Sequence, residues 1–229
     1  MSGAAPLRVL LVDDHVLLAD SLAVALRAEG VDATLADLDS RETLVQTVRD
    51  DPPDLVLLDL ELGGALGDGA TLVRPFVQAG TRVLLVTASR RKAQIGAAIE
   101  QGACGVVSKA APFDTLLERC LAGARGEPVM TQDDRQRSLQ HLYAAREREA
   151  EARAPFERLT PREQVVLREL CNGNSVAGIA EEWVVSEATV RTQERGILTK
   201  LGASSQLEAV ARALHAGWLE DVRRDRRRS

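Results

Sequence analysis

The sequence is poor in cysteine, histidine and aromatic residues, and the first two shortages each exclude a class of protein. Three cysteines in 229 residues are too few and too widely spaced for a disulfide framework or a zinc site. We therefore interpret Cys104, Cys120 and Cys171 as reduced thiols packed in apolar surroundings. The three histidines lie far apart in the sequence, so no two of them have the spacing of a metal-binding pair.

Long hydrophobic runs are also absent. A charged residue interrupts every apolar run within about a dozen residues, whereas a membrane-spanning helix needs a longer uninterrupted stretch. A hydrophobic content of 45% with 28% charged residues is ordinary for a globular protein, and the length suits two modest domains. We expect a cytoplasmic protein that does not insert into a membrane.

In the first half of the chain, short apolar runs alternate with amphipathic stretches of helical length. The runs fall near residues 7–13, 32–36, 54–60, 82–88 and 104–108. Runs this short and continuously apolar are typical of buried parallel strands. Five strand–helix repeats predict an α/β fold with a five-stranded, parallel, doubly wound sheet. In such a sheet the ligand crevice lies beyond the carboxyl ends of the strands.

Polar residues stand at the carboxyl ends of four of these runs. They are the pair Asp13 and Asp14, then Asp59, Thr87 and Lys109. Carboxylates that meet at one edge of a sheet repel one another unless a cation joins them, so the pattern predicts a Mg²⁺ site. Beside such an ion, Asp59 can act as a nucleophile toward a phosphoryl group, while Thr87 and Lys109 bind the phosphoryl oxygens.

This half of the chain resembles the receiver domain of two-component response regulators, and we assign residues 1–125 to such a domain. The matching residues are Asp13, Asp14, Asp59, Thr87–Ala88 and Lys109. The resemblance implies a flavodoxin-like fold and phosphorylation of Asp59 by a sensor histidine kinase. It also implies Mg²⁺ bound by Asp13, Asp14, Asp59 and the backbone carbonyl of Glu61.

Two features depart from the receiver pattern. Leu62-Gly63 replaces the usual Met-Pro, in a segment, residues 63–69, whose glycine content predicts a mobile loop. Val106 stands where many receivers carry an aromatic residue, three positions before the lysine. In the family that ring reports the movement of the threonine, so its replacement bears on the route of switching and not on the chemistry at Asp59.

Residues 126–157 are interpreted as a linker. Gly126 and Pro128 break the preceding helix, and the following stretch is rich in Arg, Glu, Ala and Gln. Helical spacing of Leu139 and Leu142 predicts that the linker is partly helical. At the far end, residues 219–229 form a basic tail that either touches phosphates through charge alone or is simply solvated.

Capping signals divide residues 158–218 into helices. Thr160, Pro161 and Glu163 form a capping box, and Ser186 begins a longer helix that Gly202 ends. A short helix, a tight turn and a longer helix predict an all-α helix-turn-helix domain whose second helix enters the DNA major groove. On that helix a wheel places Val190, Ile197 and Leu201 inward, with Thr192, Arg195, Gly196, Thr199 and Lys200 on the opposite arc and Arg191 at its border.

We predict that this exposed arc binds DNA. Arg191, Thr192, Gln193 and Arg195 suit base edges or phosphates, and Lys200 suits phosphate. The domain resembles the LuxR-type, or NarL/FixJ-type, DNA-binding domain, and the resemblance implies contacts from Arg191, Thr192 and Arg195. The matching residues are Leu159–Glu163, Ile179–Ala180, Ser186, Thr189–Arg191, Ile197 and Lys200–Gly202. A homodimer on a palindromic double-stranded operator is expected.

Three functions fit these motifs. The first is a DNA-binding transcriptional regulator switched by phosphorylation of Asp59. The second keeps the DNA-binding role but places it under the control of a ligand or a protein partner, because Leu62-Gly63 and Val106 depart from the receiver pattern. The third, a phosphatase that turns over through an aspartyl phosphate, is disfavoured because the chain has no added cap domain and no acid two residues past Asp59 other than Glu61. We therefore expect no enzyme.

Overall fold

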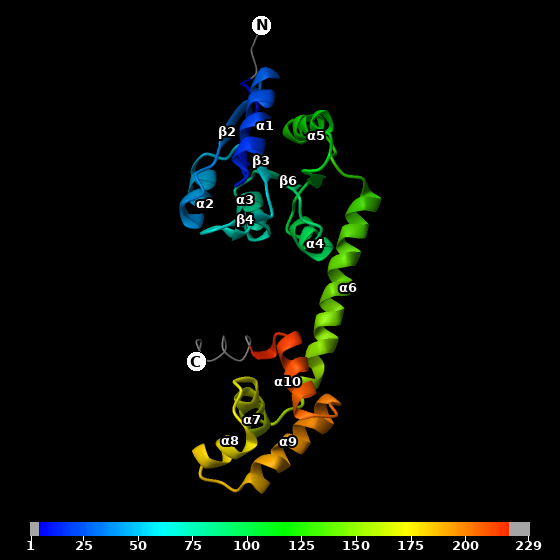
Figure 1. Ribbon diagram of the computed structural model, residues 1–229. Coiled ribbons are helices and arrows are strands. Elements are labelled where there is room, and N and C mark those ends of the chain that lie inside the picture. The colour runs from blue at the N-terminus through cyan, green and yellow to red at the C-terminus, as the bar shows by residue number, and fades with distance from the viewer. Residues whose placement is uncertain (1–4, 220–229) are drawn as a thin grey trace. The chain divides into compact units, whose positions relative to one another are not determined.

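The structure is a computed structural model that describes residues 5–219 (Figure 1). The chain forms two compact units that divide between Ala145 and Arg146. The basic tail expected at residues 219–229 lies outside the described residues, apart from Leu219. Within residues 5–219, none of the helices combines the length and the apolar character that a bilayer crossing requires.

The first unit is built around five parallel strands in the order β2-β1-β3-β6-β7 (Figure 1). The strands are β1 (Arg8–Val12), β2 (Asp32–Leu35), β3 (Leu55–Leu58), β6 (Arg82–Thr87) and β7 (Gly105–Ser108). The winding direction reverses between β1 and β3, which places a crevice at the carboxyl ends of these two strands. The predicted five-stranded, doubly wound α/β fold is confirmed.

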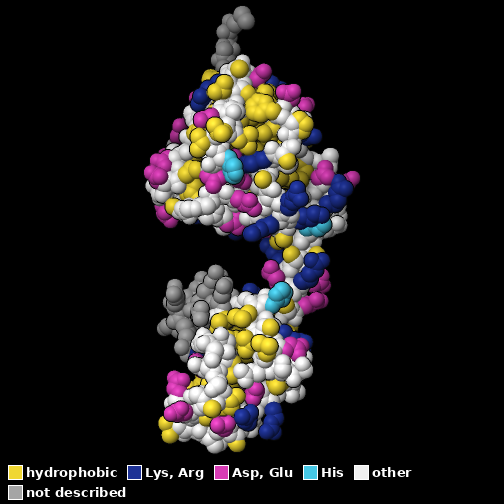
Figure 2. Space-filling model, viewed as in Figure 1, with side chains coloured by type: hydrophobic (Ala, Val, Ile, Leu, Met, Phe, Trp, Pro, Cys, Tyr) yellow, Lys and Arg dark blue, Asp and Glu magenta, His cyan; other side chains and the backbone are white. Residues whose placement is uncertain are grey.

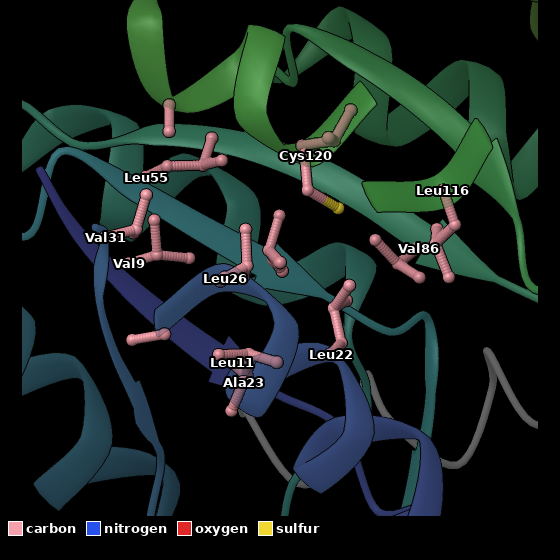
Figure 3. Close-up of a cluster of buried hydrophobic side chains, with 14 of the residues drawn as sticks. Val9, Leu11, Leu22, Ala23, Leu26, Val31, Leu55, Val86, Leu116 and Cys120 are labelled. Carbon is pink, nitrogen blue, oxygen red and sulfur yellow. The ribbon is translucent and has the colours of Figure 1, made fainter. Parts of the chain in front are cut away.

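Helices cover both faces of this sheet. They are α1 (Val16–Ala28) and α5 (Phe113–Arg125) on one face, with α2 (Arg41–Asp50), α3 (Ala70–Gln78) and α4 (Lys92–Glu100) on the other. Figure 3 shows Leu22 of α1 and Cys120 of α5 in the same buried cluster as strand residues such as Val9 and Leu55. Burial raises the pKa of the Cys120 thiol to about 12, so this cysteine packs as an inert apolar group, as the sequence predicts.

The glycine-rich segment after Asp59 forms a short hairpin, not the loop that its composition predicts. Strands β4 (Glu61–Gly63) and β5 (Gly67–Asp68) pair in the antiparallel sense, and Gly63, Gly64 and Gly67 adopt positive φ angles of 58°, 49° and 62°. Leu62 and Leu66 are each only 4% exposed and join the core cluster beneath α3. These two apolar anchors fix a segment that glycine alone would leave free.

The predicted linker contains one long helix, α6 (Gln132–Glu157), whose first half belongs to the first unit. Arg135 donates hydrogen bonds of 3.2 Å and 3.3 Å to the carbonyl oxygens of Ile99 and Ala103 at the end of α4. Close contact between the two helices requires Gly96, because a Cβ there would stand 2.3 Å from the backbone oxygen of Ser138. The segment up to Ala145 is therefore a sixth helix of the first unit.

The second unit is helical, and its helices begin at the capping residues that the sequence contains. They are α7 (Pro161–Cys171), α8 (Val176–Glu182), α9 (Glu187–Leu201) and α10 (Gln206–His215), capped by the side chains of Thr160, Ser175, Ser186 and Ser205. Phe156, at the end of α6, stacks on Trp218 with ring centroids 5.7 Å apart. The end of α6 thus belongs to the core of this second unit.

Candidate functional site

The carboxyl ends of β1 and β3 place three carboxylates in one pocket. Asp13 and Asp14 follow β1, Asp59 follows β3, and one carboxylate oxygen from each lies within 4.8 Å of the others and of His15 Nδ1. Asp59 is 2% exposed, and the Asp13 side chain is 8% exposed. Charges this poorly solvated are costly unless a cation accompanies them.

Lys109, which follows β7, supplies one of the positive charges that these carboxylates require. Its Nζ lies 2.6 Å from Asp59 Oδ2 and 2.7 Å from Asp13 Oδ1, and its side chain is 7% exposed. The backbone N–H of Lys109 donates to the carbonyl oxygen of Thr87 at 3.0 Å, which fixes the lysine to the end of β6. Three carboxylates and one ammonium leave two negative charges in the pocket, the charge that a divalent cation neutralises.

The donor set of the pocket fits Mg²⁺. The carboxylates of Asp13, Asp14 and Asp59 offer hard oxygen ligands at one point, which this ion prefers. The backbone N–H of Glu61 donates to Asp59 Oδ1 at 3.2 Å, so the Glu61 backbone lies beside the pocket while its side chain is exposed. These are the four residues that the sequence assigns to the metal.

His15 is a further member of the pocket, and it is not among the site residues that the sequence assigns. It is the residue that precedes α1, and its Nδ1 lies 2.9 Å from Asp14 Oδ1 and 3.1 Å from Lys109 Nζ. Its position directly after the acid pair was the only available signal, because a helix-start residue gives no indication of where its ring points. The side chain is 61% exposed, so the imidazole forms the outer wall of the pocket.

Gly69 forms the inner wall behind Asp59. A Cβ at Gly69 would lie 2.0 Å from the backbone oxygen of Asp59, a distance that no side chain tolerates. The N–H of Gly69 donates to the carbonyl oxygen of Leu60 at 3.0 Å, which closes the base of the β4–β5 hairpin. The glycines after Asp59 therefore include one whose role is close backbone packing.

Thr87 ends β6 with a side chain that hydrogen bonds connect to α4. The residue is 2% exposed, and its Oγ1 accepts from the N–H of Ser89 at 3.1 Å, which leaves the hydroxyl proton available to donate. Ser89 Oγ in turn contacts Gln94 Oε1 at 3.3 Å, and Gln94 Nε2 donates to Asp68 Oδ1 at 2.8 Å. This chain of contacts joins the end of β6, α4 and the hairpin.

A second site is the exposed face of α9 in the helix-turn-helix unit. The three residues expected to face inward are buried, with Val190 1%, Ile197 0% and Leu201 3% exposed. Arg191, Thr192 and Arg195 are exposed, while Gln193 is half-buried. Arg191 pairs with Glu187 at 3.3 Å, and both side chains are more than half exposed, so this pair is a weak surface interaction.

Lys200 and Gly196 do not lie on the free arc where the helical wheel places them. Lys200 Nζ lies 2.6 Å from Glu163 Oε2, and a Cβ at Gly196 would lie 2.4 Å from Glu163 Oε1. The physical reason is that the capping box of α7 directs Glu163 across α9, and Gly196 gives its carboxylate room. A helical wheel of α9 alone cannot predict this contact, because Glu163 belongs to a different helix.

Comparisons with known proteins match both units. Residues 9–121 match the response regulator receiver domain, and residues 157–213 match the luxR family of bacterial regulatory proteins. The nitrate/nitrite response regulator protein NarP of Escherichia coli is 32% identical over 213 residues, which cover 91% of this chain and 95% of that protein. The probable transcriptional regulatory protein NarL of Mycobacterium tuberculosis is 31% identical over 224 residues, which cover 96% and 100%.

A solved structure of the RcsB response regulator of Salmonella typhimurium has 22% sequence identity and a TM-score of 0.49, covering 91% of this chain and 98% of that one. The two family models and the two relatives together span both units of the chain. The acidic pocket lies in the first matched region and the helix-turn-helix in the second. This chain therefore belongs to the NarL/LuxR family of two-component response regulators, DNA-binding transcriptional regulators with a receiver domain that are not enzymes.

Proposed function

We propose that a sensor histidine kinase phosphorylates Asp59 and that the modification controls how a homodimer binds its operator. The observation that carries this proposal is the environment of Asp59. Its carboxylate is 2% exposed, lies 2.6 Å from the ammonium of Lys109, and converges with Asp13 and Asp14. Membership of a family of two-component regulators supports the kinase and the operator as partners.

The residues of the pocket divide the chemistry among them. A carboxylate oxygen of Asp59 attacks phosphorus and forms an O–P bond, while the bond to the donor nitrogen breaks and its electron pair leaves with the imidazole. Lys109 pairs with one phosphoryl oxygen and the hydroxyl of Thr87 donates to another. Asp13, Asp14, Asp59 and the Glu61 carbonyl would hold Mg²⁺, which would neutralise the charge of the carboxylates and the phosphoryl oxygens.

Phosphorylation of Asp59 changes the hydrogen-bond partners of Thr87 and Lys109, and the conformational switch starts from this change. Lys109 exchanges Asp59 Oδ2 for the phosphoryl group, and Thr87 turns its hydroxyl toward it. Because Ser89 and Gln94 lie in contact one after the other, this movement reaches α4. Shifts of α4 and α5 then change self-association or free the recognition helix.

On the output side, we assign DNA contacts to the exposed face of α9. Arg191 and Arg195 reach guanine edges or phosphates, Thr192 offers a methyl group, and Gln193 reads adenine where it reaches. The Thr192 hydroxyl already donates to the carbonyl oxygen of Ala188 at 2.8 Å. Lys200, which the sequence assigns to phosphate, receives a positioning role instead, because Glu163 holds its ammonium.

Replacement of Asp59 by Asn tests the acceptor. We expect the full chain to incorporate one phosphoryl group per molecule from phosphoramidate in the presence of Mg²⁺, and Asp59→Asn to incorporate none, because the amide is a poor nucleophile. Intact mass at neutral pH measures this directly. Asp54→Asn is the matched control, since Asp54 precedes the same strand at its opposite end and accepts from the Arg8 N–H at 2.8 Å.

Three outcomes would contradict all or part of this proposal. Continued labelling of Asp59→Asn at the wild-type level would remove Asp59 as acceptor. Labelling that is lost in Asp54→Asn as well would show that the substitutions act on the fold of the strand. If the wild-type chain labels but binds operator DNA equally well in both states, the acceptor stands and the proposed switch fails.

A further inference from the structure

A second cavity of the first unit lies between α4, β7, α5 and the start of α6. Its volume is about 570 Å³, within the range of sites that hold small organic molecules. Five apolar side chains line it, namely Ile95, Val106, Val107, Val129 and Met130. We propose that this α4–α6 pocket binds a small organic anion with an apolar body.

The polar lining of the α4–α6 pocket is basic. Lys92, Arg119, Arg137 and His141 line the cavity together with a single carboxylate, that of Asp134. That carboxylate is occupied, because it accepts from the Thr131 hydroxyl at 2.7 Å and forms an ion pair with Arg137. Arg119 donates to the carbonyl oxygen of Val129 at 3.2 Å.

Two of the basic side chains have no partner of their own. Among residues 5–219, neither the Lys92 ammonium nor the His141 imidazole forms a hydrogen bond or an ion pair. An ammonium beside an apolar floor is a strong site for a carboxylate or another single anionic group. The apolar floor then buries the body of the same molecule. A purely inorganic anion would leave this floor uncovered.

The charge of this pocket differs from that of the unit around it. Residues 1–145 contain 20 acidic and 14 basic side chains, yet three permanent cations and one carboxylate line the cavity. Figure 2 shows lysine and arginine side chains gathered over α4 and the start of α6. A local positive field in an acidic unit attracts anions and repels cations of the same shape.

Val106 is one of the apolar residues that line the floor of the pocket. It lies in β7, three residues before Lys109, at the position where many receivers have an aromatic ring. Because its side chain lines the floor, a larger residue there would fill part of the cavity. The small side chain of Val106 therefore leaves space in the pocket that an aromatic ring would occupy.

Occupancy of the pocket stabilises the docked form of α6. One wall is α4, and another is the first half of α6, which Arg135 and Gly96 hold against α4. A molecule that contacts both walls binds only the docked arrangement, so it shifts the equilibrium toward that arrangement. The inference is independent of phosphorylation, since neither Asp59 nor the other predicted metal ligands line this cavity.

Titration of the full chain with 2-naphthoate and with its neutral analogue 2-naphthamide tests the proposal. We expect one naphthoate site per chain by calorimetry, with the amide at least tenfold weaker. Lys92→Gln combined with His141→Gln should weaken naphthoate at least fivefold and leave the amide unchanged. Arg90→Gln is the matched control, because Arg90 is an exposed neighbour of Lys92 that does not line the cavity. Naphthoate should also slow hydrogen exchange in the first half of α6.

Val106→Trp adds a steric test and should abolish binding of both compounds. Its thermal unfolding and its phosphoramidate labelling show whether the receiver is intact. If Val106→Trp does not fold, the Lys92→Gln, His141→Gln double variant still tests the proposal, because it removes charge at exposed positions without filling the cavity. Equal affinity for naphthoate and naphthamide, or unchanged naphthoate binding in the double variant, would overturn the proposal.

Discussion

Glu187 illustrates how much a single exposed residue can matter on the DNA-binding face. It begins α9 and pairs with Arg191 at 3.3 Å, with the two side chains 52% and 55% exposed. Its carboxylate repels DNA phosphates and competes with them for the guanidinium. We expect Glu187→Gln to tighten operator binding roughly three- to tenfold and to steepen its salt dependence, as one more effective cation does.

A filter-binding or anisotropy titration at several salt concentrations measures this effect. Glu181→Gln is the control, because Glu181 is an exposed acid of α8 outside the recognition helix. The cost to stability should stay within about 1 kcal/mol, the usual contribution of an acid in the first helical turn. Unchanged affinity and salt slope would show that Glu187 points away from the bound DNA.

Glu163 and Glu208 make the second unit sensitive to acid. Burial alone would raise the pKa of Glu163, but hydrogen bonds from Lys200 and Thr160 outweigh burial and lower it. Hydrogen bonds from the Ser204 hydroxyl and backbone, and then from Arg212, lower the pKa of Glu208 to about 2. A carboxyl with a pKa below its unfolded value of about 4.5 stabilises the fold above that pH and loses the contribution as pH falls.

We therefore expect the melting temperature of the second unit to decline as pH falls from about 4.5 toward 2. Scanning calorimetry of the full chain at a series of pH values measures this decline. Glu208→Gln should flatten the curve in that range, because the amide cannot gain a proton. A curve with the same slope in Glu208→Gln and Glu163→Gln as in the wild type would assign the acid sensitivity to other groups.

Among the secondary structure elements, α6 depends on a single glycine of α4. Alanine in place of Gly96 would favour an isolated helix by about 1 kcal/mol. In this fold the added methyl would meet the Ser138 backbone oxygen at 2.3 Å and Leu142 Cβ at 2.9 Å. We expect Gly96→Ala to destabilise the first unit by about 2 kcal/mol and to speed hydrogen exchange in the first half of α6.

Gly178→Ala in α8 is the matched control for that substitution. A Cβ at Gly178 would find Ser175 Oγ at 3.4 Å, an ordinary contact, so this variant should be slightly stabilised. Denaturant unfolding of both variants supplies the comparison. Stabilisation by Gly96→Ala would mean that α6 does not pack closely against α4 in solution.

The elements that sequence reasoning predicts well are those whose signals are local. Continuous apolar runs predict the five parallel strands, and caps such as Thr160 and Ser186 predict where the helices of the second unit begin. The β4–β5 hairpin is not predicted, because it is held by the packing of Leu62 and Leu66 into the core beneath α3. The local sequence gives no sign of this packing. Contacts across elements, such as that of Lys200 with Glu163, are not visible from either helix alone.

At the scale of the whole molecule, the surface of α1 is unusually apolar for an exposed helix. Val16, Leu17 and Val24 are 62%, 86% and 64% exposed, and Figure 2 shows hydrophobic side chains gathered over this helix. The proposed homodimer would remove apolar surface from water if it buried this face. We expect Leu17→Glu to weaken self-association at least tenfold while it changes the free energy of unfolding by no more than about 0.5 kcal/mol.

Sedimentation equilibrium with and without phosphoramidate measures the association. Tyr143→Gln serves as the control, because Tyr143 is an exposed apolar residue of α6, 51% accessible, on a different element. An unaltered dimer in Leu17→Glu, or equal loss in both variants, would place the dimer contact elsewhere on the chain.

The scarcity of aromatic residues gives the molecule an optical property. Its two tryptophans, Trp183 beneath the Arg162 guanidinium at 4.1 Å and Trp218 stacked on Phe156, both belong to the second unit. Indole emission from the unlabelled full chain therefore originates only in the half that binds DNA, and excitation that selects indole leaves out Tyr143 of the first unit. Any change in that emission when a phosphodonor is added would therefore report coupling from the first unit to the second, without a fluorescent label.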